Sequence, residues 1–340
     1  MLPLTEHWDG SSWAEVAVPH GPGLSAVVAP AAGDAWAFGS SRFAERWNGS
    51  SWHSVSLPLP RGVQAVELVR AAATSANDVW VVGSSEGATR PRNRALVEHW
   101  NGSRWRIVPI PRVKVYSELS GVTALSPKNI WAVGASGVDV GKRIALRTLV
   151  LHWNGRRWKR VRSPNPAARK TLRAQVWDSL YSVAGASAKD LWAVGSYFFR
   201  AGRRHTHHTL VVHWDGRRWT QVPSPSPGGN SRTSLLNDVT AGSASDVWAV
   251  GRYVRHGNQP LVEHWDGTRW SVVSFPGSGG LSGVTALSSD DAWAVGETSV
   301  GHWDGSAWSA EGTPGSNDLL NELAAVSPSD IWAVGLRLKY

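Results

Sequence analysis

The segment HWNGSRW, residues 99–105, decides the fold because it returns along the chain with little change. Its copies HWNGRRW (152–158), HWDGRRW (213–219) and HWDGTRW (264–270) keep two tryptophans five residues apart, on either side of Asn-Gly or Asp-Gly. These dipeptides are the strongest short-range signals for a tight β-hairpin. We therefore predict a hairpin that the chain repeats, which indicates a repeat architecture.

Three features recur in seven copies each. The leading Trp of the hairpin motif stands at positions 8, 47, 100, 153, 214, 265 and 303, and the second Trp follows five residues later every time. The motif [DN]-x-W-A-V-G, varied to WAFG and WVVG in the first two copies, has its Trp at 36, 80, 131, 192, 248, 293 and 332. Twelve residues before that Trp there is always a leucine: Leu24, Leu68, Leu119, Leu180, Leu236, Leu281 and Leu320. Only Trp177 lies outside these motifs.

Each unit reads as four short strands, which we label A to D. In the third copy the expected strands are LSGVTAL (119–125), IWAVG (130–134), LVLHW (149–153) and RWKRV (157–161), with a variable loop between B and C. Four antiparallel strands per repeat at this spacing are typical of a β-propeller. Trp offers a large flat surface for packing blade on blade, and we expect its N–H to find a partner at the blade rim.

The two ends of the sequence each carry half a repeat. The chain begins with a C–D hairpin (7–18) and finishes with an A–B hairpin (320–340). An open array of repeats would need atypical capping units, which we do not find. We therefore expect the two halves to pair in one sheet. The prediction is a single all-β domain over residues 1–340, a seven-bladed β-propeller with four antiparallel strands per blade.

Composition narrows the classes of function. The chain has no cysteine, which excludes disulfides, thiolate metal sites and a Cys nucleophile. It has no long apolar run that predicts a membrane span. The start MLPLTEHWDG enters the repeat at once, so we expect no signal peptide within this sequence. The formal charge of +9 favours anionic partners, although a merely solvated basic surface explains it equally well.

The paired motifs S-x-x-D-x-W-A-V-G and H-W-[DN]-G-x-x-W resemble those of Trp-rich repeat propellers from bacteria, and more distantly the kelch and galactose-oxidase-like propellers. The resemblance covers the whole chain. It implies a propeller fold and, because such proteins are often exported, an extracellular or cell-surface location. It brings no catalytic residues with it. The kelch double glycine and the Gly-His motif of WD40 repeats are missing, and a Cys-free chain cannot build the Tyr–Cys cross-link of galactose oxidase.

The B–C loops are the first candidate for a binding site. They vary in length, are longest in repeats two to five, and are rich in arginine. Variable loops on a rigid scaffold commonly carry binding, guanidinium groups match carboxylate, sulfate and phosphate, and aromatic faces can stack on sugars or bases. The long D–A connection before the fourth strand A adds Arg169, Lys170 and Arg173. The candidate ligand-binding residues are Arg143, Arg147, Trp177, Tyr197, Arg200, Arg203, Arg204, Arg252 and Arg255.

The histidines are expected to be structural. Six of them precede a hairpin Trp at the same repeat position, and such recurrence indicates a structural hydrogen bond: His7, His99, His152, His213, His264 and His302. The cluster His205, His207 and His208 offers imidazole ligands for a metal, but its loop setting and the lack of nearby carboxylates argue against a site. We assign no metal and no cofactor.

Three functions remain open. The favoured one is a non-catalytic binding propeller that recognises an anionic glycan or a protein partner on its basic B–C/D–A face. The second is a polysaccharide hydrolase or lyase with an axial active site, which would need convergent acidic residues at the starts of the A strands. Only Asp178, Asp238 and Glu322 stand out there, and no catalytic motif is present. The third is a structural scaffold. No nucleic-acid-reading module is present, and we expect a monomer.

Overall fold

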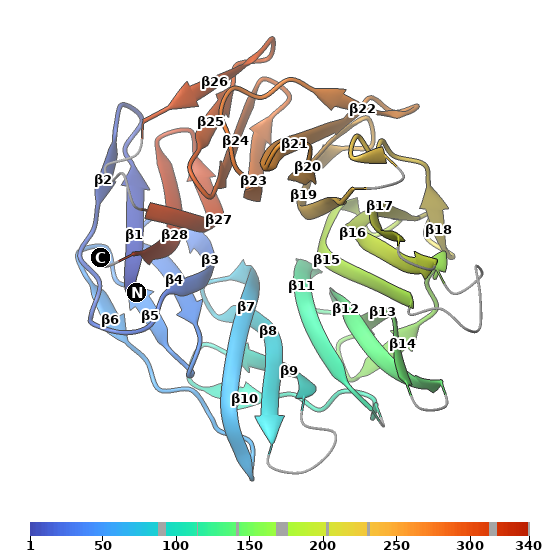
Figure 1. The fold of residues 1–340 in the computed structure, drawn as a ribbon. Helices are drawn as coiled ribbons and strands as arrows, with labels where there is room; N and C mark the ends of the chain where they lie inside the picture. Colours follow the sequence, from blue (N-terminus) through green and yellow to red (C-terminus); the bar gives the residue numbers. More distant parts are fainter. Residues whose placement is uncertain are drawn as a thin grey trace.

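The computed structural model describes residues 1–87, 93–113, 115–140, 143–167, 176–201, 204–229, 232–312 and 318–338. Within these ranges, side chains are described except at 139–140, 143–144, 199–201 and 204–205. The fold is an all-β propeller, whose sheets stand around a central axis (Figure 1). Over the described ranges no helix is long and apolar enough to cross a membrane.

The described residues form 28 strands. Five sheets have four strands and one has eight. The first two sheets contain β3 (Leu24–Ala31), β4 (Asp34–Gly39), β5 (Ala44–Trp47) and β6 (Trp52–Ser54), then β7 (Val63–Ser75), β8 (Asp78–Gly87), β9 (Asn93–Trp100) and β10 (Trp105–Ile107). Two later sheets contain β19 (Ser234–Ser243), β20 (Asp246–Val254), β21 (Asn258–Trp265) and β22 (Trp270–Val273), then β23 (Leu281–Ser288), β24 (Asp291–Gly296), β25 (Val300–Trp303) and β26 (Trp308–Glu311).

The eight-stranded sheet consists of two units with the same four-strand pattern. The first unit contains β11 (Ser117–Ser126), β12 (Asn129–Val140), β13 (Arg143–Trp153) and β14 (Trp158–Val161). The second contains β15 (Val176–Ser187), β16 (Asp190–Ala201), β17 (Arg204–Trp214) and β18 (Trp219–Val222). A single parallel pair, Leu146 with Trp177, joins β13 to β15.

The two ends of the chain share the remaining sheet. Its order is β2 (Trp13–Glu15), β1 (Leu2–Trp8), β28 (Asp330–Arg337) and β27 (Asp318–Ser327). Strands β1 and β28 pair antiparallel from Leu2 opposite Arg337 to Trp8 opposite Ile331, and the two termini lie side by side (Figure 1). The guanidinium of Arg337 donates to Asp318 at 2.7 Å and to Glu15 at 2.9 Å. The first and last hairpins are therefore held by backbone pairing and by an ion pair.

The innermost strands carry the repeated leucine. Each of these strands contacts the next one along the chain, and β27 contacts β3. All seven leucines are at most 2% exposed: Leu24, Leu68, Leu119, Leu180, Leu236, Leu281 and Leu320. The twelve-residue spacing to the Trp of strand B therefore marks a residue that faces the core between sheets.

Neighbouring four-strand units, including the two within the eight-stranded sheet, meet at clusters of three indole rings, which explains the repeated tryptophans. Trp36 of β4 lies 5.3 Å from Trp100 and 5.2 Å from Trp105 of the next sheet, the latter edge-on at 82°. The same triad recurs as Trp80 with Trp153 and Trp158, Trp131 with Trp214 and Trp219, Trp192 with Trp265 and Trp270, Trp248 with Trp303 and Trp308, Trp293 with Trp8 and Trp13, and Trp332 with Trp47 and Trp52. The expected packing of tryptophans between neighbouring repeats is confirmed.

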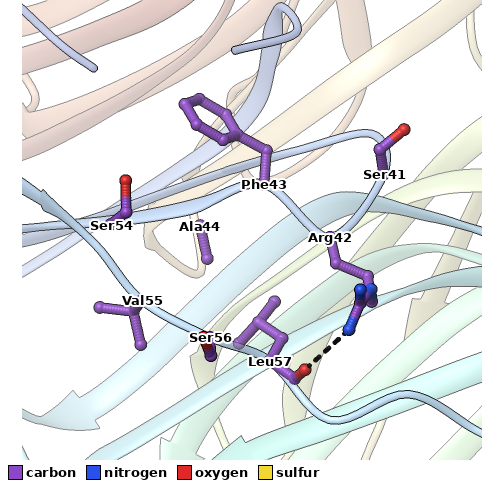
Figure 2. Close-up of a pocket in the computed structure, with 8 residues that line it drawn as sticks. All are labelled: Ser41, Arg42, Phe43, Ala44, Ser54, Val55, Ser56 and Leu57. Carbon is purple, nitrogen blue, oxygen red and sulfur yellow. Dashed lines mark hydrogen bonds between the residues drawn. The ribbon is translucent and has the colours of Figure 1, made fainter. Parts of the chain in front are cut away.

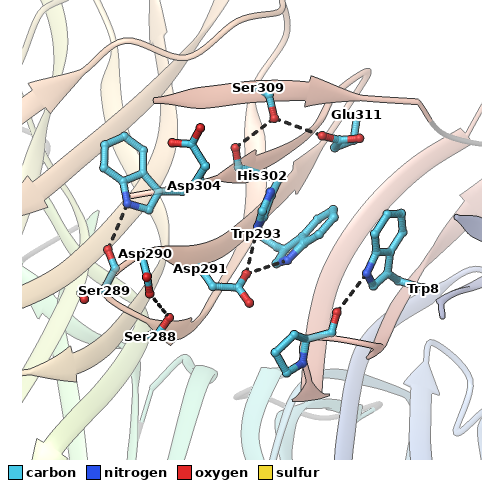
Figure 3. Close-up of polar contacts among 12 residues, drawn as sticks. Trp8, Ser288, Ser289, Asp290, Asp291, Trp293, His302, Asp304, Ser309 and Glu311 are labelled. Carbon is cyan, nitrogen blue, oxygen red and sulfur yellow. Dashed lines mark hydrogen bonds and ion pairs between the residues drawn. The ribbon is translucent and has the colours of Figure 1, made fainter. Parts of the chain in front are cut away.

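The expectation for the indole N–H groups holds only in part. Some leading tryptophans do reach the rim, as Trp8 does by donating to the carbonyl of Pro328 at 3.0 Å (Figure 3). The second Trp of every hairpin, however, has a buried N–H without a hydrogen-bond partner among the described residues. The reason is its edge-on burial against the next sheet, which gains packing area at the expense of that hydrogen bond.

Two local features differ from the sequence prediction. The paired tryptophans face one another directly, so the hairpin connection is a four-residue loop closed by the Asp or Asn side chain rather than a two-residue turn. Gly155, with φ of 87°, supplies the left-handed conformation in one such loop. The residues expected as B–C loops in repeats three and four instead extend the strands, as far as Val140 opposite Arg143 and Ala201 opposite Arg204. Their β-branched and aromatic residues favour pairing over a loop.

Candidate functional site

The repeated histidines form a structural network, as predicted. In every copy the Nε2 atom lies 2.6–3.0 Å from the Asp or Asn that begins strand B. His302 illustrates the arrangement, because Asp291 contacts both its imidazole and the indole N–H of Trp293 (Figure 3). In the first full repeat Arg46 replaces the histidine, donates to Asp34 at 2.8 Å and lies over Trp36. These residues are occupied in holding strands B and C together.

The second histidine cluster packs against aromatic rings. His207 lies 4.7 Å from the ring of Phe198, and His208 lies 5.1 Å from that of Tyr197. Among the described residues no group of three His, Asp or Glu side chains is placed to hold a metal ion. The side chain of His205 is outside the described set.

The candidate aromatic residues do not converge on one surface. Trp177 pairs with Phe198 across β15 and β16, with ring centroids 5.1 Å apart. Tyr197 is the neighbour of Phe198 in the same strand, so its side chain lies on the opposite face of the sheet. Burial raises the pKa of Tyr197. Strand alternation therefore places the rings of Trp177 and Tyr197 on opposite faces of the sheet.

Two candidate arginines are neutralised by acidic neighbours. The guanidinium of Arg147 lies 3.3 Å from the carboxylate of Asp178, which is fully buried and also accepts from the backbone N–H of Ala167. Arg252 lies 3.6 Å from Glu297 in the next sheet. Neither charge is fully available to an anionic ligand.

The remaining candidates are only partly described. Arg255 is exposed, and its carbonyl accepts a hydrogen bond from Arg232. Arg143, Arg200 and Arg204 belong to β13, β16 and β17, but their side chains lie outside the described set. The following candidates lie outside the described residues altogether: Arg203, Arg169, Lys170 and Arg173.

A charged cluster lies where three innermost strands face one another. Arg70 of β7 lies 2.8 Å from Glu322 of β27 and 3.3 Å from Asp238 of β19. It also donates to the carbonyl of Ser282 in β23, while Asp238 accepts from the N–H of Val284. All three charged side chains are nearly buried. The sequence analysis singled out Asp238 and Glu322 but missed Arg70, which occupies the equivalent repeat position.

This cluster bears on the enzyme reading. Desolvation raises the pKa of Glu322, and the guanidinium of Arg70 opposes that shift. A general acid–base pair needs two carboxylates that face a substrate. Here both carboxylates face one buried arginine, and Asp178, the third candidate, is engaged by Arg147. The arrangement can hold strands together, but it does not present an acid and a base to a ligand.

Buried glutamates form a second feature that the sequence analysis missed. They stand two residues before the leading Trp in four copies and are fully buried: Glu6, Glu45, Glu98 and Glu263. Burial raises the pKa of Glu98 to about 8 and that of Glu6 to about 7. In the third and fourth repeats the same position holds Leu151 and Val212. The recurrence of Glu at this position is visible in the sequence, and strand alternation places its side chain on the buried face of the sheet.

We expect Glu98→Leu to stabilise the protein at pH 8. The substitution introduces leucine, the residue that the third repeat carries at the equivalent position, Leu151. Glu98 holds its proton in the folded state up to a pKa of about 8, whereas the unfolded chain releases it near 4.5. Its contribution to stability is therefore complete below pH 4.5 and is lost progressively up to pH 8, an effect of about 2–4 kcal/mol. Melting temperatures from pH 5 to pH 8 should fall less steeply in Glu98→Leu than in the wild type. Exposed Glu86→Leu is the control, and a variant slope equal to the wild type would refute the prediction.

Among the hollows that described residues line, two are considered as candidate sites. The smaller, about 210 Å³, lies beside the β4–β5 turn, where Ser41 and Arg42 both have positive φ (Figure 2). The guanidinium of Arg42 is engaged there, because it donates to the carbonyl of Leu57 at 3.2 Å (Figure 2).

The larger hollow is a groove of about 610 Å³ on the B–C/D–A face. Its walls are Arg94 and Ala95 of β9, the D–A connection from Ile110 to Val113, and Ser117 of β11. Arg94 and Arg112 are exposed, and in the described part of the chain no side chain pairs with either guanidinium. The groove combines two uncompensated cations with aliphatic walls. The B–C loops were predicted to be rich in arginine, but neither Arg94 nor Arg112 was among the candidate binding residues.

Comparison with known proteins places the fold. No family model and no characterised protein matches the sequence. Among solved structures, YCF48 bound to D1 peptide matches with a TM-score of 0.59 and 12% identity over 95% of this chain and 96% of that one. YCF48 from Cyanidioschyzon merolae matches with a TM-score of 0.60 and 16% identity over 96% of this chain and 97% of that one. The WD40 β-propeller domain of Doa1 matches with a TM-score of 0.59 and 12% identity over 98% of this chain and 97% of that one. At these identities the similarity establishes a β-propeller fold alone.

Proposed function

We propose that this protein is a non-catalytic binding propeller that takes an acidic segment of a partner protein into the Arg94–Arg112 groove of its B–C/D–A face. The scaffold is a single domain over residues 1–340 with seven blades, in which the eight-stranded sheet counts as two. The contact of each innermost strand with the next, and of β27 with β3, supports this count. The pairing of β1 with β28 supports a ring completed by the two ends of the chain.

The groove is the observation that carries the proposal. Its volume of about 610 Å³ falls within the range common for ligand sites, and its lining joins aliphatic walls to a few polar groups. Guanidinium forks bind carboxylates in pairs of hydrogen bonds. The aliphatic walls of Ile110 and Val113 suit the side chain of an apolar residue next to an acidic one. One solved propeller of this fold carries a bound peptide.

An anionic glycan is the second candidate ligand for the same face. Arg143, Arg200, Arg203, Arg204 and Arg255 would extend the basic surface toward it. Among the described residues that line the groove, none is an aromatic ring that could stack on a sugar, which favours the peptide. The resemblance of the repeat motifs to Trp-rich propellers that are often exported supports an extracellular or cell-surface location. Scattered exposed hydrophobic residues, Met1, Leu59 and Val272 among those described, support a monomer.

The enzyme and scaffold readings explain less of the structure. An axial hydrolase would have to use Asp238 and Glu322, which are already paired with Arg70. A pure scaffold gives no reason for two uncompensated arginines beside a hollow.

Binding of labelled acidic peptides tests the proposal. The probes are peptides in which Asp or Glu alternates with Leu or Ile, compared with Asn/Gln versions and with oligoglucuronate. We expect the double variant Arg94→Ser/Arg112→Ser to bind the acidic peptides about tenfold or more weakly than the wild type, because two charge-assisted contacts are lost. The control, Arg61→Ser/Arg106→Ser, removes the same charge from exposed positions outside the groove. Equal affinity for the two variants, or binding of oligoglucuronate alone, would overturn the peptide assignment.

A further inference from the structure

The C–D hairpin turns contain arginines that the turn itself does not need. In every turn the Asp or Asn oxygen accepts hydrogen bonds from the backbone N–H groups two and three residues later. Asn154 does so with Arg156 and Arg157, both at 3.1 Å. Asp304 does so with Ser306 and Ala307, at 2.8 and 2.9 Å. The two donor residues contribute only their backbone N–H groups to these bonds, so the bonds do not require any particular side chain at either position.

Serine at the first of these two positions serves the turn better than arginine. The hydroxyl groups of Ser11 and Ser306 donate additional hydrogen bonds to Asp9 and Asp304, each at 2.7 Å. Arg156 and Arg217 stand at the same position, and among the described contacts their side chains have no such bond to Asn154 or Asp215. Arginine at this position therefore lacks the hydroxyl hydrogen bond that serine makes within the turn. Its presence there indicates a function other than stabilising the turn.

The arginines are confined to one side of the ring. Four consecutive hairpins carry them, whereas the other three have Ser or Ala at both positions. Two A–B turns of the same sheets add lysines, which lie beside the hairpin glycines: Lys128 at Gly155 and Lys189 at Gly216. All eight cations are exposed, and we call this set the turn patch: Arg104, Lys128, Arg156, Arg157, Lys189, Arg217, Arg218 and Arg269.

Little in the turn patch neutralises these charges. Arg218 lies 3.9 Å from Asp215 and Arg269 lies 4.0 Å from Asp266, across exposed side chains. Exposed pairs at such distances contribute little. In the part of the chain that the structure describes, the other six cations form no ion pair. The turn patch is therefore a concentrated positive surface, on the face opposite the Arg94–Arg112 groove.

The chemistry of the turn patch limits its partner. The exposed large hydrophobic residues among those described are Met1, Leu59 and Val272, none of which belongs to a turn of the patch. Single-stranded nucleic acid needs aromatic platforms for its bases, reading of duplex sequence needs an element that enters a groove, and protein hot spots need buried apolar or aromatic anchors. A partner recognised through repeated charges alone remains.

We propose that the turn patch is a second binding site, which holds a linear polysaccharide bearing sulfate or carboxylate groups across four consecutive hairpin turns. Guanidinium pairs such as Arg156 with Arg157 match these groups in forked hydrogen bonds. The site is independent of the groove and takes a different class of ligand.

Salt elution from immobilised heparin tests this proposal. The variant Arg156→Ser/Arg157→Ser/Arg217→Ser/Arg218→Ser installs the residue that other hairpins carry, so its fold should be retained, which an unchanged melting temperature verifies. We expect elution at clearly lower salt and about tenfold or weaker affinity for heparin in solution. The control, Arg61→Ser/Arg94→Ser/Arg112→Ser/Arg255→Ser, has the same net charge and should elute like the wild type.

The outcomes separate the two sites. If both quadruple variants lost the same heparin affinity, the loss would be an effect of net charge, and the turn patch would be overturned as a binding site. If only the control variant lost heparin affinity, heparin would bind the groove face, and this result would also overturn the turn-patch proposal. Duplex DNA that binds as tightly as heparin, with the same dependence on the turn arginines, would overturn the polysaccharide assignment. Peptide binding by the turn variant, measured in parallel, reports on the groove separately.

Discussion

Deletion of residues 1–19 is expected to abolish cooperative folding. The deletion removes β1 and β2, so β28 loses one of its two hydrogen-bonded neighbours from Ile331 to Arg337 and keeps only β27. It also removes buried Leu4 and the two indoles that pack on Trp293. Loss of a fully buried Trp costs about 3–5 kcal/mol, which is an upper bound for each of these half-buried indoles, and loss of a buried Leu costs about 2–5 kcal/mol. Their sum is comparable to the whole stability of a typical domain, about 5–15 kcal/mol.

Thermal unfolding followed by circular dichroism and calorimetry measures this effect. A synthetic peptide of residues 1–19, added in trans, is the control, because it restores the missing strands without a covalent link. We expect the truncated chain to be unfolded already at 25 °C, so that heating shows no cooperative transition. Addition of the peptide should partly restore that transition. A truncated protein with the melting temperature of the wild type would show that the first hairpin does not complete the last sheet.

Replacement of Arg70 by methionine is expected to destabilise the protein by about 3–5 kcal/mol. The substitution keeps the length of the side chain but leaves Asp238 and Glu322 buried beside one another without a cation. Breaking a buried ion pair from one side is costly for this reason, whereas neutralising all partners together is not. The triple variant Arg70→Met/Asp238→Asn/Glu322→Gln should therefore recover at least half of the loss.

Denaturant unfolding of the single and triple variants checks this account. Asn at position 238 retains an oxygen for the N–H of Val284, so the contact to β23 is preserved. Exposed Arg61→Met is the control for loss of an arginine as such. If the single and triple variants lost the same free energy of unfolding, the cluster would matter through packing and not through charge.

The sequence predicts the parts of the fold that recur. The leucine, the strand-B Trp and the hairpin pair each occupy one geometry seven times, so their spacing predicts strands, turns and the packing of the hairpin on the next sheet. The six histidines follow from the same logic. A position that returns in every repeat is constrained by the scaffold, and its role can be inferred without knowing which strands are distant neighbours.

The residues that occur once are harder to place. Arg70, Asp238 and Glu322 belong to three separate repeats and meet across the innermost strands, so no spacing along the chain reveals their contact. The opposite orientations of Trp177 and Tyr197 follow from strand alternation, but only once the supposed loop is known to be strand. The groove of Arg94 and Arg112 joins β9 to a D–A connection that has no regular pattern.

The most direct test of the ring is a cross-link between the two ends of the chain. Because the protein has no cysteine, Pro3→Cys/Leu336→Cys places its only two thiols on residues that face one another in β1 and β28. A short bis-maleimide should convert the monomer to a covalently closed form, with a shifted mobility on a denaturing gel. The control pair, Ser11→Cys/Leu336→Cys, puts the thiols at opposite ends of the same sheet and should not close. Absence of closure in the first pair, equal closure in both, or linked dimers would contradict a ring completed by the first and last hairpins.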